Sequence, residues 1–193
     1  MTRSLNEEKI LSFHRQKEYG SPMNSLQRLL ERLDKAWRDF LESYAGLSEA
    51  ELLKPGVTGS WSVRDIIAHV TTWEEEALKC LPLAIQGKRP PRYSVMYGGI
   101  DAFNTRATAH KKGLALSEVL RQQSLVHHQL IDFIISVPEE YLGGATRFRH
   151  RLRMDAYGHY PKHAQAIREW RSSVHGLTRC PVNGMGGGNY GRR

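Results

Sequence analysis

Residues 59–87 read GSWSVRDIIAHVTTWEEEALKCLPLAIQG, and this stretch decides the fold class. Ser62 is a typical N-cap residue, and Asp65 three positions later places a negative charge at the positive end of a helix dipole. The spacing therefore predicts a long amphipathic helix that Pro82 kinks or ends. Apolar residues recur every three or four positions, as on one buried helix face: Val63, Ile66, Ile67, Val70, Trp73, Ala77 and Leu81.

Three other stretches have the same helical period, namely residues 25–47, 116–137 and 154–174. A shorter helix is expected over residues 100–113, and Ser48 and Ser117 are the expected caps of the helices that follow them. No stretch alternates with period two, so no sheet is expected. Four long helices joined by long crossover connections predict an all-α four-helix bundle.

Both ends of the chain differ in composition from the middle. Residues 1–22 end in Gly-Ser-Pro, and the last residues, NGMGGGNYGRR, are too rich in glycine to build a core. The sequence therefore predicts an N-terminal extension over residues 1–22, a helical bundle over residues 23–175, and a flexible Gly-rich tail over residues 176–193.

Composition excludes several classes of protein. Hydrophobic residues make up 40% and charged residues 25% of the 193 positions, as in ordinary globular domains. Without a run of ~18 apolar residues or a signal peptide, the expected location is the cytoplasm, with no membrane segment. Two distant cysteines, Cys80 and Cys180, make neither a disulfide framework nor a cysteine zinc site, and Cys80 is expected to be a small buried residue.

The net charge of +8 is spread along the chain rather than concentrated. The segment from residue 176 onward contributes three positive charges and residues 1–22 contribute one, which leaves a charge of 8 − 3 − 1 = +4 for the middle. This balance is that of a mildly basic domain and not of a strongly electropositive DNA-binding protein. The basic run RFRHRLR, residues 147–153, is interpreted as a solvated connection, with phosphate binding or weak DNA binding as the alternatives.

Three histidines form a candidate metal site. His159 and His163 are four positions apart in a predicted helix, which places both imidazoles on one face about 6 Å apart. His69 lies in the apolar stripe of residues 59–87, where a histidine must be hydrogen-bonded or bind something. Three imidazoles suit Zn²⁺, Ni²⁺ or Fe²⁺ and leave a further position open. Spacing alone is also compatible with a structural interpretation, in which His159 and His163 are a pair on the surface and His69 is a hydrogen-bonded core residue.

The segments GSWSVRDIIAHVTTWEEEAL, DAFN and YGHYPKHAQAIREW resemble the DinB-like superfamily of metal-binding four-helix bundles, and within it the ClbS/DfsB family. The resemblance covers about residues 23–172. It implies that His69, His159 and His163 bind a divalent metal ion, with zinc or nickel as the expected metal. Some members of the superfamily are metal-dependent thiol transferases or isomerases, and the ClbS branch is linked to resistance against a genotoxin through opening of a reactive cyclopropane.

Several neighbouring side chains have both a functional and a structural interpretation. Trp61 and Trp73 are expected to flank His69, either as pocket walls or as simple packing. The remaining candidates could contact a ligand or support the metal-binding histidines, and each also has a structural interpretation as a helix cap, a packing residue or a surface residue. They are Asp101, Asn104, His128, Tyr157 and Tyr160.

The leading functional hypothesis is a metal-dependent enzyme that acts on a reactive small electrophile by hydrolysis or thiol transfer. The alternatives are a small-molecule-binding or sequestering bundle without catalysis, and a weak DNA-binding protein. The expected partner is a small-molecule substrate or ligand, and a homodimer is compatible with the sequence.

Overall fold

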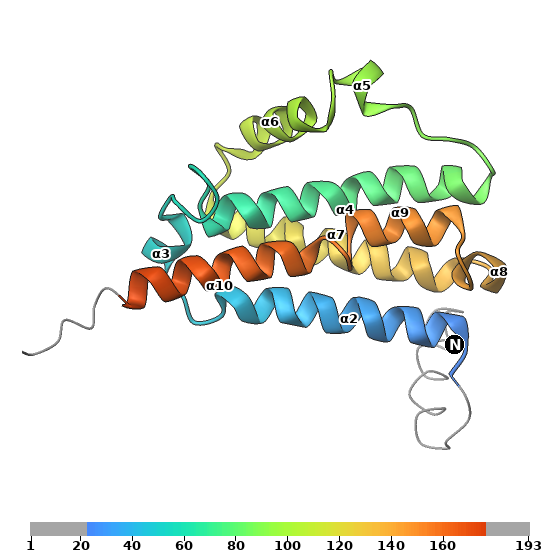
Figure 1. Cartoon of the computed structure of the whole chain (residues 1–193), viewed down its shortest axis with the longest axis horizontal. Coiled ribbons are helices and arrows are strands. Elements are labelled where there is room, and N and C mark those ends of the chain that lie inside the picture. The colour runs from blue at the N-terminus through green and yellow to red at the C-terminus, as the bar shows by residue number, and fades with distance from the viewer. Residues whose placement is uncertain (1–22, 177–193) are drawn as a thin grey trace, which may run out of the picture.

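The computed structural model describes residues 23–176, and these contain helices and no strand apart from one isolated bridge between Thr58 and Trp61. The bundle is formed by α2 (Ser25–Tyr44), α4 (Val63–Ile85), α7 (Leu116–Ser136) and a fourth arm that consists of α9 (Arg147–Asp155) and α10 (Tyr160–Gly176), as Figure 1 shows. The predicted all-α four-helix bundle is therefore confirmed.

The order of the helices in space follows from one long crossover. Helices α4 and α7 pack together, α2 packs on α10, and α9 packs on α4. The chain leaves α4 through α5 (Tyr93–Met96) and α6 (Ile100–Lys111), which lie outside the bundle, and enters α7 at the end where α4 began (Figure 1). The buried Arg64 guanidinium fixes the connection between α6 and α7 to the start of α4. It donates hydrogen bonds to the carbonyls of Lys111, Lys112 and Leu114.

The core lies between the four arms, and six of the seven residues in the apolar stripe of residues 59–87 belong to it, the partly exposed Trp73 being the exception. The fully buried members of the core come from every arm, among them Leu33, Phe40, Ile66, Leu130 and Ile167. On α7, Val126 is buried and its neighbour Leu125 is 47% exposed. Short helices close the ends of the bundle, α3 (Glu49–Leu53) with the predicted Ser48 cap and α8 (Glu139–Leu142).

The predicted start of α4 is confirmed in detail. The Ser62 side chain accepts from the backbone N–H of Asp65, and the Asp65 carboxylate accepts from the backbone N–H of Ser62 at 3.0 Å, which makes a capping box. Pro82 does not end the helix, which continues to Ile85.

The connection expected over residues 147–153 was wrong, because RFRHRLR forms part of helix α9. Phe148 and Leu152, four positions apart, are both buried and give this basic helix an apolar face against α4. Two predicted caps were wrong as well. Helix α6 starts at Ile100 after Gly99 (φ 117°), so Asp101 lies inside it, and α7 starts after Ala115 without a side-chain cap from Ser117.

The predicted extension over residues 1–22 lies outside the described residues, and so does the predicted tail except for Gly176, which ends α10. Among the helices within residues 23–176, none has the length and apolar character needed to cross a membrane.

Candidate metal centre

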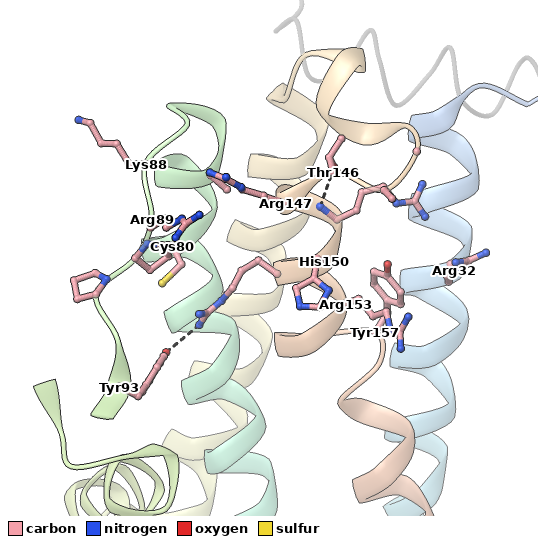
Figure 2. Close-up of a pocket in the computed structure, with 17 residues that line it drawn as sticks. Arg32, Cys80, Lys88, Arg89, Tyr93, Thr146, Arg147, His150, Arg153 and Tyr157 are labelled. Carbon is pink, nitrogen blue, oxygen red and sulfur yellow. Dashed lines mark hydrogen bonds between the residues drawn. The ribbon is translucent and has the colours of Figure 1, made fainter. Parts of the chain in front are cut away.

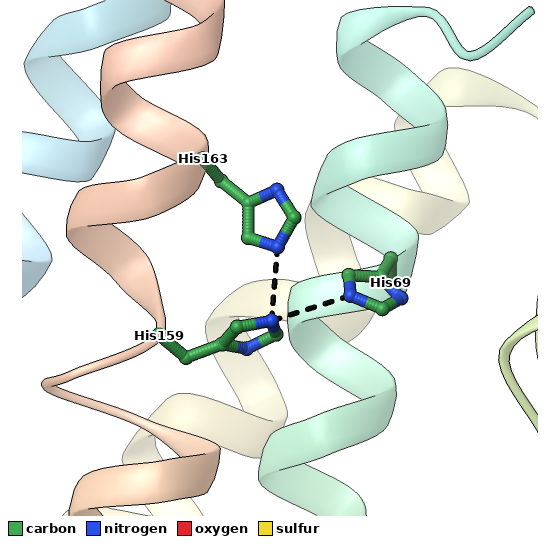
Figure 3. A group of neighbouring side chains, drawn as sticks. All are labelled: His69, His159 and His163. Carbon is green, nitrogen blue, oxygen red and sulfur yellow. Dashed lines mark hydrogen bonds between the residues drawn. The ribbon is translucent and has the colours of Figure 1, made fainter. Parts of the chain in front are cut away.

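Helix α4 positions the first histidine. His69 lies two turns into the helix and is only 6% exposed, because its neighbours in the apolar stripe, Ile66 and Val70, face the core. Its Nδ1 atom is buried and has no hydrogen-bond partner among residues 23–176, so its polar contact is made through Nε2. The ring therefore points out of α4 toward α10, as Figure 3 shows.

A break in the fourth arm positions the second histidine. The sequence predicts one helix over residues 154–174, but the chain forms a turn over residues 156–159 before α10 begins at Tyr160. A Cβ on Gly158 would lie 2.7 Å from the Arg153 carbonyl oxygen, so only glycine fits this turn. His159 thus precedes α10, and its carbonyl accepts from the backbone N–H of Lys162.

The three imidazoles converge on a common point. His159 Nε2 lies 3.3 Å from His69 Nε2 and 2.9 Å from His163 Nε2 (Figure 3). One ligand atom from each ring lies within 4.8 Å of the others. Nitrogen ligands around a tetrahedral zinc ion, each about 2.1 Å from the metal, lie about 3.4 Å apart. The spacing of the three donor atoms therefore fits a single divalent cation.

Burial keeps these imidazoles neutral, which is the form that binds metal. It lowers the pKa of His69 to about 3, with a further contribution from the neighbouring His163. Burial also lowers the pKa of His159 to about 2 and that of His163 to about 4, and positive charge at Lys162 adds to both effects. All three rings are thus uncharged near neutral pH, and each has one nitrogen lone pair to offer.

Trp61 and Trp73 lie beside the histidine cluster, as the sequence predicted when it placed them next to His69. The ring centroid of Trp61 lies 5.0 Å from that of His69, and the centroid of Trp73 lies 6.0 Å from that of His159. The Trp73 indole Nε1 donates to Asn104 Oδ1 at 3.2 Å, so Asn104 orients this ring from α6. Asp101 is exposed on α6 and takes no part in this contact.

Sequence reasoning missed a buried polar network next to the cluster. Glu74, fully buried in α4, accepts from the Tyr160 hydroxyl and lies 2.7 Å from His127 Nδ1 through the same Oε1 atom. The Trp37 ring stacks on His127 with centroids 3.7 Å apart. The apolar stripe of α4 could have revealed Glu74, because Val70 and Ala77 on either side of it are buried.

The other candidate residues lie away from the cluster. The Tyr160 hydroxyl donates its hydrogen bond to Glu74. The Tyr157 ring lies against Arg32, whose guanidinium carbon is 6.0 Å from the ring centroid. His128 is exposed on α7, where Nδ1 contacts the Ser124 carbonyl at 2.6 Å, so it is not a partner of the cluster. Cys80 is buried as predicted, and burial raises the pKa of its thiol.

Comparison with known proteins agrees with the observed fold. The family model of the DinB superfamily matches residues 32–166, which is more than half of the chain. The solved structure of the sibling lethal factor precursor DfsB superimposes with a TM-score of 0.65 at 15% sequence identity, and the match covers 79% of this chain and 98% of that one. At this identity the match shows a shared fold, and it falls in the branch that the sequence motifs resemble. No curated protein gives a significant match.

Proposed function

This chain belongs to the DinB superfamily, and from that premise we propose that it is a metal-dependent protein whose ion is held by His69, His159 and His163. We further propose that it acts on a reactive small electrophile by hydrolysis or thiol transfer. Zinc and nickel are the preferred ions because three neutral imidazoles suit both of them.

The convergence of three Nε2 atoms from α4 and the start of α10 carries the proposal. Buried polar atoms are expensive unless they are paired, and three neutral rings that share one point cannot all donate to one another. With the proton of each ring on Nδ1, the three Nε2 lone pairs face the same point. A cation at that point would satisfy all three.

The chemistry needs an ion and an apolar surface beside it. A bound divalent ion would lower the pKa of a coordinated water or thiol, which supplies a nucleophile near neutral pH. Trp61 and Trp73 line the cluster with apolar rings that can hold the carbon skeleton of a small electrophile and keep bulk water away on that side. Asn104 keeps Trp73 in this orientation.

Metal binding is tested by calorimetric titration of zinc and of nickel into the full chain, purified without a polyhistidine tag and dialysed free of metal. We expect one ion per chain. His163→Ala should weaken binding by about a hundredfold or more, because it leaves two ligands. His175→Ala is the matched control, since this exposed histidine lies twelve positions along α10, roughly 18 Å from His163. Equal affinities of the two variants would exclude the triad as the metal site.

Catalysis is tested separately with the zinc-loaded chain and a model electrophile such as styrene oxide, with and without an added thiol. In hydrolysis water opens the ring, and in thiol transfer a C–S bond forms while the ring C–O bond breaks and the thiol proton moves to the ring oxygen. We expect product formation that His163→Ala abolishes. Tight zinc binding without turnover of any electrophile would instead favour the non-catalytic sequestering bundle.

A further inference from the structure

A pocket of about 740 Å³ lies outside the histidine cluster. Its walls are α9, the carboxyl end of α4 with the segment that follows it, and a few side chains of other elements (Figure 2). None of the three clustered histidines lines this pocket. Tyr157, two positions before His159, is the lining residue nearest to the cluster in sequence.

The lysine and arginine side chains give the lining of the pocket a strong positive charge. The lining contains no aspartate or glutamate. Helix α9 contributes four arginines at alternate positions and His150 between them, which is the basic run that the sequence analysis interpreted as a connection. The lysine and arginine side chains of the lining are Arg32, Lys88, Arg89, Arg147, Arg149, Arg151 and Arg153.

Part of this charge is compensated within the protein, and part is not. Arg151 pairs with the buried Asp155 and donates to the Tyr93 hydroxyl at 2.9 Å, so it is held in place. Arg149 donates to the Leu142 carbonyl, which is neutral. Within residues 23–176, neither Arg89 nor Arg153 has an acidic partner, and both are exposed.

We propose that this pocket binds a phosphorylated small molecule. Guanidinium groups bind phosphate through paired, charge-assisted hydrogen bonds, and several of them around one cavity favour a doubly charged anion over a single carboxylate. A phosphate in the pocket would offset the repulsion among the unpaired cations of its walls.

The pocket also has room and surface for the organic part of such a molecule. Ala84, Pro90, Pro91 and Tyr93 add apolar area to the lining, and the Arg151 guanidinium lies 5.6 Å from the Tyr93 ring centroid. The volume falls in the range of about 300–1,000 Å³ that is typical of small-molecule sites. A concave pocket of this size favours a small ligand over duplex DNA, whose backbone binds along an extended basic surface.

The experiment is a calorimetric titration of the full, metal-free chain with phenyl phosphate, with inorganic phosphate and with phenol. Chelator must be removed by dialysis, because its carboxylates would compete for the arginines. Phenyl phosphate is expected to bind in a saturable, salt-sensitive way, inorganic phosphate more weakly and phenol not at all. Equal binding of phenyl phosphate and inorganic phosphate would still support a phosphate site but would assign it to the free ion.

Variants place the site within the molecule. Arg153→Gln should weaken phenyl phosphate binding by about tenfold or more, because it removes one charge-assisted contact. Arg106→Gln is the control, since Arg106 is exposed on α6 and does not line the pocket. Unchanged binding in Arg153→Gln together with unchanged binding in Arg89→Gln would overturn the proposal. So would salt-dependent retention of duplex DNA without saturable binding of phenyl phosphate. Because no metal is present, the result is independent of the function proposed for the histidine cluster.

Discussion

Replacing His69 with glutamine should make the metal-free protein less sensitive to acid. Burial, together with the neighbouring His163, lowers the pKa of His69 to about 3 in the folded protein. In the unfolded chain a histidine has a pKa of about 6.5. As the pH falls below about 6.5, this histidine becomes protonated in the unfolded chain but stays neutral in the folded protein. The free energy of unfolding therefore decreases.

The size of the effect follows from these two pKa values. Between about pH 7 and about pH 5, a group with a pKa of 6.5 unfolded and about 3 folded reduces the free energy of unfolding by about 2 kcal/mol. This is a large share of the roughly 5–15 kcal/mol that stabilise an ordinary domain. His159 and His163 act in the same direction, because their pKa values are lowered to about 2 and about 4. Glutamine at position 69 keeps a polar side chain and removes one titrating group.

The assay is urea unfolding of the metal-free protein at about pH 7, 6 and 5. The wild type should lose about 2 kcal/mol more than His69→Gln over this range. His128→Gln, which replaces an exposed histidine on α7, controls for the loss of a histidine as such and should follow the wild type. An acid-induced loss of the same size in the wild type and in His69→Gln would refute the buried, neutral state of this imidazole.

Three further substitutions test the packing around the site. Leu130→Ala should reduce the free energy of unfolding by about 2–5 kcal/mol in urea titrations, since Leu130 is fully buried, and a loss under about 0.5 kcal/mol would contradict its core position. Gly158→Ala should weaken zinc binding by about tenfold in calorimetry, because the added Cβ meets the Arg153 carbonyl oxygen and displaces the turn before α10; wild-type affinity would show that the turn tolerates a side chain. Tyr160→Phe leaves the buried Glu74 without a hydroxyl donor and should lower the thermal midpoint by the equivalent of about 1–3 kcal/mol, and an unchanged midpoint would mean that this hydrogen bond adds nothing.

The histidine cluster was predictable because each of its members leaves a local trace in the sequence. His69 falls in an apolar stripe, and His159 and His163 are separated by the spacing that brings side chains together on one helix face. The basic pocket left only a partial trace, the basic run RFRHRLR of residues 147–153. Its cations come from α2, from the segment after α4 and from α9, which are far apart in the chain. The helical spacing of the buried pair Phe148 and Leu152 was not recognised in the sequence, because arginines surround both residues.

The four long helical segments and their apolar stripes could be predicted from the sequence, because both depend on residues three or four positions apart, but helix α9 and the turn before α10 could not. The sequence also pointed to the three histidines that the structure brings together, His69, His159 and His163. The register of α4 against the start of α10, which brings Nε2 of His69 to 3.3 Å from Nε2 of His159, depends on the packing of the bundle. The turn at Gly158, which divides the fourth arm into α9 and α10, and the assembly of the basic pocket also depend on tertiary packing. These features depend on how side chains far apart in the chain pack together, and local periodicity carries no information about that packing.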